Sequence, residues 1–67
     1  MEATIQVNGE TRRTAGGTVI DLLRELGLED GRVAIERNWE ILPRQKWNET
    51  KVIGGDCYEI VHFVGGG

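Results

Sequence analysis

The sequence predicts an α+β fold in which one helix packs across an antiparallel or mixed sheet. Three observations favour it. Apolar and polar residues alternate over residues 3–7, an apolar helical stripe spans Val19–Leu26, and a largely apolar run covers residues 57–64. A period of two is typical of half-buried strands, whereas apolar residues at i, i+3, i+4 and i+7 are typical of an amphipathic helix.

The first two strands are expected to form a β-hairpin. Asn8 and Gly9 directly follow the alternating residues 3–7. A type I′ turn needs φ > 0 at both of its central residues, so Asn-Gly is the strongest short hairpin signal. The second strand, about residues 10–14, is mostly polar and must therefore have an exposed face.

The helix is expected to begin after Thr18 and to end at Gly27. Asp21 lies three residues after Thr18, a spacing that resembles a capping box. Gly27 is placed to end the helix in the left-handed conformation. The stripe that would face the sheet consists of Val19, Leu22, Leu23 and Leu26.

Shorter extended segments follow the helix. Residues 33–35 predict a short strand, and Asn38 predicts a turn because asparagine tolerates left-handed geometry. Residues 41–42 form another extended piece, held out of helical geometry by Pro43. Pro43 also opens a tight turn that would fold Trp47 back onto the core.

Residues 57–64 are expected to form the final and most hydrophobic strand. The order is then strand, strand, helix, strand, short strand, strand, which fills two layers and matches the β-grasp arrangement. No repeat, linker or low-complexity stretch divides the chain. We therefore expect one β-grasp domain over residues 1–64 and a flexible glycine tail at residues 65–67.

Length and charge exclude several classes of function. A chain of 67 residues buries only about 60% of its extended surface, which leaves little room for a cofactor cleft. The net charge is −3, the pI is near 5.0 and the basic residues are scattered, so nucleic acid is not an expected partner. No apolar run approaches the ~20 residues of a membrane span. A single cysteine and the lack of a signal-like segment fit a cytoplasmic protein.

No catalytic constellation is evident. Cys57 and His62 are five residues apart, which places them on opposite faces of a strand and does not favour a Cys–His pair. The ligands for a metal site are lacking, and no carboxylate lies in an apolar run that would shift its pKa. Residues 16–18 lack the Lys-Ser/Thr pattern of a phosphate-binding loop. The sequence therefore predicts a protein that is not an enzyme.

The chain ends in Gly65, Gly66 and Gly67, directly after the last apolar run. Three residues without side chains can thread a narrow slot. They reach roughly 10 Å, about the depth of an enzyme cleft, so the terminal carboxylate could itself be the reactive group. Termini are commonly disordered, so a frayed end is the alternative reading of the tail alone.

Alternation along the last strand separates two faces. Tyr58 and Ile60 share one face, whereas Glu59, Val61 and Phe63 share the other. One helix covers only one face of the sheet, and Glu59 indicates that its own face is open to solvent. A partner that grips Val61 and Phe63 would aim the terminal carboxylate.

These features together resemble the ThiS family, the ubiquitin-like sulfur carrier proteins of thiamine biosynthesis. The resemblance covers essentially the whole chain. The pieces that carry it are residues 7–10, Thr18-Val19 with Leu22-Leu23, residues 34–44, Trp47, Gly55-Asp56 and Gly66-Gly67. Pro43-Arg44-x-x-Trp47 combined with a terminal Gly-Gly is distinctive. Trp39 departs from the family, in which Gly or a small polar residue often follows the asparagine.

The resemblance implies a carrier chemistry. An ATP-dependent, ubiquitin-activating-like enzyme of the ThiF type would adenylate Gly67, aided by access at Gly66, and a persulfide donor would leave a thiocarboxylate. Thiazole synthase, of the ThiG type, would then receive the sulfur. The carrier would bind no cofactor or metal, since its partner consumes the ATP. The residues expected to contact partners are Glu59, Val61, Phe63, Val64 and Gly65.

Two alternatives remain open at this stage. One is the same chemistry on another pathway, as in the small subunit of molybdopterin synthase or in carriers for cysteine or tRNA thiolation. The other is a β-grasp interaction module whose tail has no chemistry. Co-purification with thiazole synthase would separate the first alternative, and intact mass after activation would separate the second.

Overall fold

A computed structural model describes residues 2–29 and 31–63 of the chain. The glycines predicted to form the tail lie outside the described residues, as does Val64. The described elements are β1 (Ala3–Val7), β2 (Glu10–Thr14), α1 (Val19–Leu26), β3 (Val33–Arg37), β4 (Glu40–Ile41), the 3₁₀ helix η1 (Arg44–Lys46) and β5 (Cys57–His62).

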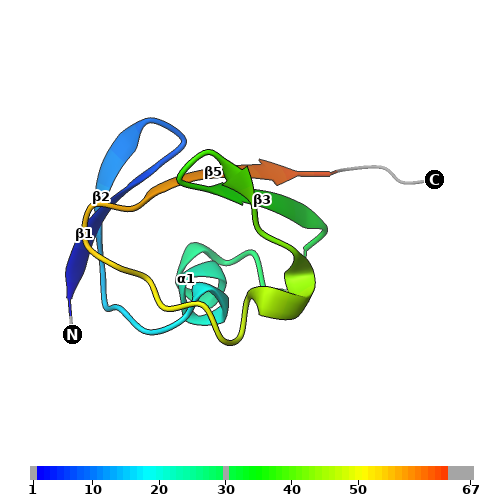
Figure 1. Ribbon diagram of the computed structural model, residues 1–67, viewed down its shortest axis with the longest axis horizontal. Coiled ribbons are helices and arrows are strands. Elements are labelled where there is room, and N and C mark those ends of the chain that lie inside the picture. Colours follow the sequence, from blue (N-terminus) through cyan, green and yellow to red (C-terminus); the bar gives the residue numbers. More distant parts are fainter. Residues whose placement is uncertain (1, 30, 64–67) are drawn as a thin grey trace.

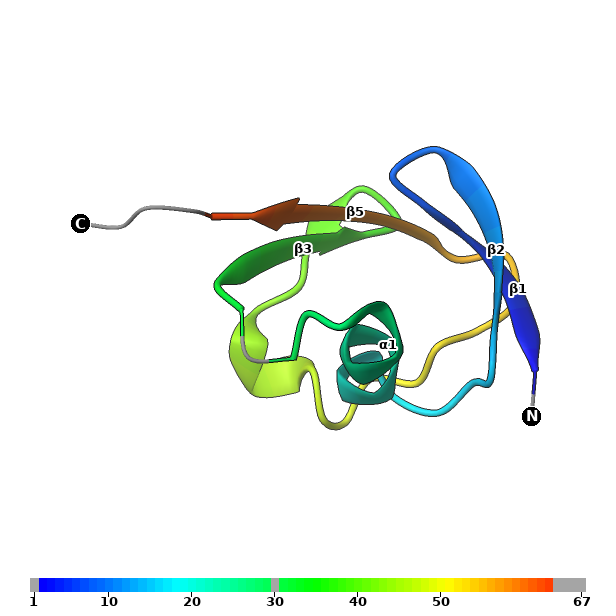
Figure 2. The same ribbon diagram turned by 180° about the vertical axis from the view of Figure 1, so that it is seen from behind.

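The strands form one mixed sheet in the order β2-β1-β5-β3-β4. The pairs β1–β2, β3–β4 and β3–β5 are antiparallel, whereas β1 and β5 run parallel at the centre of the sheet. Figures 1 and 2 show α1 on one side of this sheet from opposite directions, with no described element on the other side. The predicted β-grasp architecture is therefore confirmed.

The β1–β2 hairpin has the turn that its sequence predicts. Asn8 and Gly9 have φ angles of 51° and 84°, both in the left-handed region that a type I′ turn requires. The register pairs Val7 with Glu10 and Ala3 with Thr14. The twist of this turn matches that of the flanking strands, so β1 leads directly into β2.

The caps of α1 are also as predicted. The Thr18 side chain accepts a hydrogen bond from the Asp21 N–H at 3.4 Å, and the Asp21 carboxylate accepts one from the Thr18 N–H at 2.9 Å. Gly27 ends the helix with a φ of 76°, and its N–H donates to the carbonyl of Arg24 at 3.1 Å. Between these caps, Val19, Leu22 and Leu23 are buried against the sheet.

One core lies between α1 and the sheet. Trp47 is 4% exposed and its indole N–H donates to the Leu42 carbonyl at 3.0 Å, so the turn after Pro43 does fold onto the core. The Arg44 guanidinium lies 4.9 Å from the centre of the Trp47 ring and covers its outer side. The buried hydrophobic residues are Ile5, Val19, Leu22, Leu23, Val33, Ile35, Trp47, Val52, Tyr58 and Ile60.

Three strand bounds differ from the prediction, and the first is that of β3, which continues to Arg37 instead of ending at Ile35. The last described strand ends at His62, so Phe63 follows it instead of lying within it. The fourth strand covers Glu40–Ile41 instead of residues 41–42, because its ladder pairs Glu40 with Arg37 and Ile41 with Glu36. The turn between β3 and β4 places Asn38 and Trp39 at φ angles of 51° and 73°. It is thus left-handed at both positions, although Trp39 occupies a place that favours glycine.

Candidate functional site

The face of β5 away from α1 is open, as its alternation predicts. Val61 and Phe63 are 56% and 53% exposed, whereas Tyr58 and Ile60 on the opposite face are 1% and 8% exposed. Glu59 is exposed on the same side as Val61. We call the helix-free side of the sheet, with Glu59, Val61 and Phe63, the outer face. It lies directly before the residues that lead to the C-terminus.

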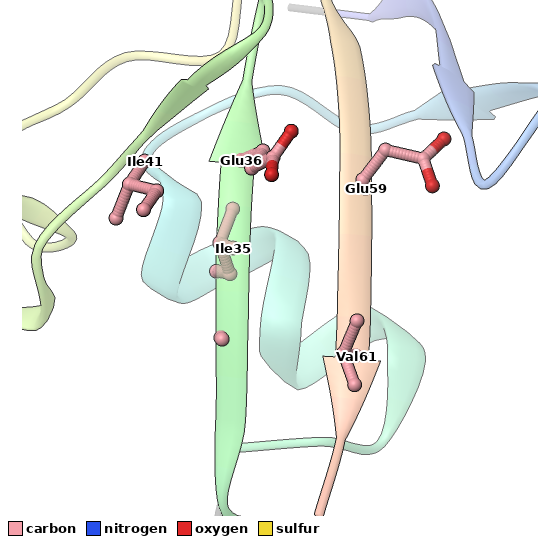
Figure 3. A pocket seen from close by; sticks show the side chains of 6 residues that line it. Ile35, Glu36, Ile41, Glu59 and Val61 are labelled. Carbon is pink, nitrogen blue, oxygen red and sulfur yellow. The ribbon is translucent and has the colours of Figure 1, made fainter.

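The outer face carries a shallow apolar groove between β5 and β4. The groove has a volume of about 150 Å³, and Figure 3 shows Val61 on one side of it and Ile41 on the other, with Glu36 and Glu59 at one end. The small side chain of Ala34 lies opposite Val61 in the β3–β5 ladder. Because Ala34 does not fill the space between its larger neighbours, the sheet surface is hollow at this point.

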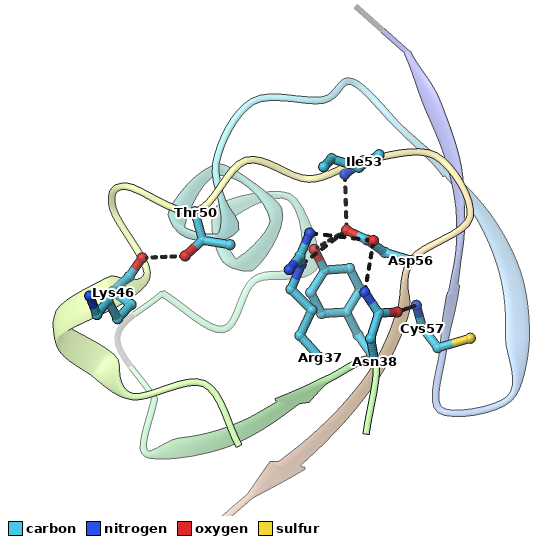
Figure 4. Close-up of polar contacts among 8 residues, drawn as sticks. Arg37, Asn38, Lys46, Thr50, Ile53, Asp56 and Cys57 are labelled. Carbon is cyan, nitrogen blue, oxygen red and sulfur yellow. Dashed lines mark hydrogen bonds and ion pairs between the residues drawn. The ribbon is translucent and has the colours of Figure 1, made fainter. Parts of the chain in front are cut away.

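The start of β5 is held by a buried carboxylate, Asp56, which is 5% exposed. The Tyr58 hydroxyl and the Ile53 N–H each donate to its Oδ2 at 2.9 Å, and Arg37 Nε donates to the same oxygen at 3.1 Å. Asn38 Nδ2 donates to Oδ1 at 3.1 Å, as Figure 4 shows. The carboxylate thus links the β3–β4 turn and the loop before β5 to the start of β5.

The electrostatics of this cluster favour an ionised Asp56. Burial alone would raise the pKa of its carboxyl group, but the hydrogen bonds from Ile53, Asn38 and Tyr58 and the charge of Arg37 lower it below its ordinary value. Burial, together with the hydrogen bond to Asp56, raises the pKa of Tyr58 to about 12. The tyrosine therefore remains a neutral donor to an ionised acceptor. No proton is available for transfer near neutral pH, and the cluster is structural.

Asn8, in the turn after β1, supports the middle of β5 along the edge that faces β1. Its Oδ1 accepts from the Ile60 N–H at 2.7 Å and its Nδ2 donates to the Ile60 carbonyl at 3.1 Å, so the amide replaces a strand backbone. The ladder between β1 and β5 itself pairs only Gln6 with Cys57 and Val7 with Tyr58. Asn8 therefore extends the support of β5 two residues beyond the ladder, toward the C-terminal end of the strand.

We expect the Asn8→Gly variant to lose about 1–3 kcal/mol of unfolding free energy. Glycine keeps the left-handed turn, so the loss reports the two hydrogen bonds to Ile60 and the buried backbone groups that they satisfy. Urea unfolding should show a lower midpoint at an unchanged m-value. A midpoint equal to that of the wild type would show that the amide does not support β5.

The lone thiol and the lone imidazole lie apart, as predicted. Cys57 is half-buried and its Sγ lies 3.5 Å from Gln6 Oε1 on the outer face, whereas His62 is exposed near the end of β5. Among residues 2–29 and 31–63, no group of three or more potential ligands could hold a metal ion. The one described α-helix, which has eight residues, is too short to cross a membrane.

The structure brings together three of the predicted contact residues, and their contact with partners stays a prediction. Glu59, Val61 and Phe63 share the outer face. The predictions for Val64 and the three glycines lie outside the described residues. No pattern in the sequence indicates the roles of Asp56 and Asn8 in holding β5. Asn8 was interpreted only as a turn residue, and no carboxylate was found in an apolar run that would shift its pKa. The pKa of Asp56 is nevertheless lowered, because the burial that would raise it is outweighed by hydrogen bonds and by the charge of Arg37.

Comparison with known proteins shows the family to which the chain is similar, and the matched residues include the end of the chain. The model of the ThiS family matches residues 5–67. The sulfur carrier protein ThiS of Bacillus subtilis is 42% identical over 65 residues, which cover 94% of this chain and 98% of the relative. A thiazole synthase of Paramagnetospirillum magneticum is 48% identical over 62 residues, or 91% of this chain, but the chain spans only 19% of that relative's length.

A solved structure agrees with these sequence matches. The crystal structure of the thiamine biosynthesis protein ThiS from Geobacter metallireducens superposes with a TM-score of 0.80 at 32% identity, covering 96% of this chain and 99% of the other. The fold and the outer face define a small ubiquitin-like protein of the β-grasp class. The chain belongs to the ThiS family of sulfur carrier proteins.

Proposed function

We propose that this chain carries sulfur as a thiocarboxylate on Gly67 and delivers it to thiazole synthase in thiamine biosynthesis. The observation that carries the proposal is that the family match runs through residue 67, which includes the terminal glycines. The fold supports it, because β5, which ends at His62 shortly before the glycines, is held in place by Asp56 and Asn8. The folded domain positions the reactive end of the chain, and the partner enzymes supply the catalysis.

The proposed chemistry begins with a poor electrophile. An α-carboxyl group has a pKa of about 3.3–3.7, so the terminus is a resonance-stabilised carboxylate at neutral pH. In an ATP-dependent activating enzyme, a carboxylate oxygen attacks the α-phosphorus of ATP and pyrophosphate leaves. The terminal sulfur of a persulfide then attacks the acyl carbon and AMP leaves. Cleavage of the S–S bond by a thiol frees the thiocarboxylate on Gly67.

Thiazole synthase is the proposed acceptor. Proteins named thiazole synthase from Paramagnetospirillum magneticum and Magnetococcus marinus contain segments that are 48% and 38% identical to this chain. These segments make up 19% and 20% of the respective relatives. A carrier-like domain and a synthase within one polypeptide are expected when the two act in sequence, because a tether raises the effective concentration of the partner.

ATP–pyrophosphate exchange tests the first step. The chain is incubated with the cognate activating enzyme, ATP and labelled pyrophosphate, and exchange is expected only when the carrier is present. The same mixture without ATP and a mixture with heat-unfolded carrier serve as controls. Carrier-independent exchange, or none with folded carrier, would contradict the proposal.

We expect Phe63→Ala to weaken binding to an activating enzyme or thiazole synthase without unfolding the domain. Phe63 is 53% exposed on the outer face, whereas Ile60 is 8% exposed within the core. Ile60→Ala should instead cost about 2–5 kcal/mol of stability. Thermal melts and isothermal titration of both variants check this. If Phe63→Ala unfolds the protein and Ile60→Ala does not, the two faces are assigned the wrong way round.

A further inference from the structure

Two glutamates are paired across neighbouring strands on the outer face. Glu36 of β3 and Glu59 of β5 are directly opposite in the antiparallel ladder, and both are exposed. Side chains in such a pair have Cβ atoms about 4.5–5.5 Å apart, and like charges at this spacing destabilise the sheet. Replacing one of the two charges by a neutral side chain of the same shape should therefore stabilise the sheet.

No described cation compensates this pair. Neither glutamate has an ion pair or a hydrogen bond with another side chain among residues 2–29 and 31–63. The adjacent Arg37 is turned to the buried Asp56 at 3.1 Å. Arg32 precedes β3 and is four positions from Glu36, about 13 Å along an extended strand.

The pair also stands at the end of the apolar groove. Ile41 lies opposite Glu36 on β4, and Val61 follows Glu59 on the same face of β5, so apolar and acidic side chains line one depression. Figure 3 shows both glutamates at the same end of this depression, with the Glu59 carboxylate directed away from Glu36. A volume of about 150 Å³ matches one benzene-sized group, such as a leucine or phenylalanine side chain. The surface thus offers an apolar pocket and a doubly negative rim within one site.

We propose that this acidic groove receives thiazole synthase through one guanidinium, bound between Glu36 and Glu59, and a neighbouring apolar side chain that enters the groove. A planar guanidinium has five N–H donors, enough to bridge two carboxylates at once. This inference rests on the proposed function and adds to it the chemistry of the partner's surface. It also gives a reason for the opposed charges. The repulsion between Glu36 and Glu59 destabilises the free carrier, and it is relieved when a cation of the partner binds between them.

Thiazole synthase is the occupant because the groove is continuous with the proposed contact surface. Val61 belongs both to the groove and to the outer face, which leads on to Phe63 and the C-terminal residues. The two relatives named thiazole synthase place a similar domain in the same polypeptide as the synthase. Val61 lines the groove and precedes the glycines by only a few residues, so binding at the groove would bring the end of the chain to the enzyme that receives the sulfur.

The first arm of the test measures stability. Glu36→Gln and Glu59→Gln keep the shape of each side chain and remove one charge. Each should raise the melting temperature by roughly 1–6 °C, because the repulsion is relieved. Glu49→Gln is the matched control, because Glu49 is exposed and lies away from the outer face. The neighbouring Thr50 carbonyl accepts a hydrogen bond from the Val19 N–H of α1, on the helix side of the sheet. The control should leave the melting temperature unchanged.

The second arm measures binding to purified thiazole synthase by titration calorimetry. Each glutamine variant should raise Kd by about tenfold at low salt, and this difference should shrink as the salt concentration approaches ~0.5 M. Ala34→Leu, which fills the groove from an exposed position, should weaken binding at an unchanged melting temperature. Glu49→Gln should bind as the wild type does.

The outcomes separate this inference from the proposed function. Variants that are more stable yet bind thiazole synthase more weakly support it. Wild-type affinity for thiazole synthase in both glutamine variants would overturn it. The wild-type carrier is tested in parallel for thiocarboxylate formation with the activating enzyme, ATP and a sulfide source. Its failure there would contradict the proposed function, whatever the glutamate variants do.

Discussion

Deletion of Gly67 is expected to abolish sulfur loading while the domain remains folded. The deletion draws the new terminal carboxylate back by about 3.5 Å. A misplacement of 1 Å at a reacting centre can already cost about 100-fold in rate, so ATP–pyrophosphate exchange should fall by at least that factor. Since the last described strand ends at His62, the melting temperature should not change.

Gly66→Ala is the companion variant, because it keeps the length of the chain. A methyl group forced into a channel shaped for glycine costs about 1–3 kcal/mol. That corresponds to roughly a 5–150-fold loss of adenylation rate if the strain is felt at the transition state. Wild-type exchange from Gly66→Ala would mean that the tail does not enter a tight channel.

Asp56→Ala should produce the largest loss of stability. It leaves the Tyr58 hydroxyl, the Ile53 N–H and the Arg37 side chain without their common acceptor. Removing one partner from a buried ion pair costs about 3–5 kcal/mol. The 67 residues of this domain supply only ~3–10 kcal/mol in total. Circular dichroism should therefore show a variant that is partly or wholly unfolded at 25 °C. A melting temperature within a few degrees of the wild type would contradict this role.

The same cluster predicts how stability depends on pH. The pKa of Asp56 is lowered in the folded state, so its contribution is present above the ordinary value of 3.8 and is lost as the pH falls through the folded-state pKa. Tyr58, whose pKa is raised to about 12 from 10.0, contributes fully below pH 10 and loses this contribution as the pH rises toward 12. Asp56→Asn should flatten the acid limb of the stability curve. If Asp56→Asn lost stability at low pH as the wild type does, that loss would have to come from other carboxylates.

The sequence was sufficient where structure depends on nearby residues. The Asn8-Gly9 turn, the Thr18–Asp21 cap and the Gly27 end of the helix each follow from side chains within a few positions of one another. The two faces of β5 followed from alternation alone, since Ile60 is buried and Val61 is exposed. Such features are fixed by backbone geometry, so they can be predicted before the fold is known.

The sequence was insufficient where function depends on residues that only folding brings together. Asp56 and Arg37 are 19 residues apart, and nothing near Asp56 in the chain indicates that it becomes buried. The bond from Asn8 to Ile60 spans 52 residues. The opposition of Glu36 and Glu59 depends on the register of β3 against β5, which a shift of one residue would abolish. Pairing of this kind has no local pattern.

The central claim is that Gly67 carries the sulfur, and intact-mass spectrometry tests it most directly. The chain is incubated with its activating enzyme, ATP and a sulfide source, and fragmentation then locates any added mass. We predict the mass increase of one oxygen-to-sulfur exchange, confined to the C-terminal fragment that contains Gly67 and absent from the Gly67-deletion variant. An unchanged mass, or sulfur located on Cys57 instead, would contradict the account.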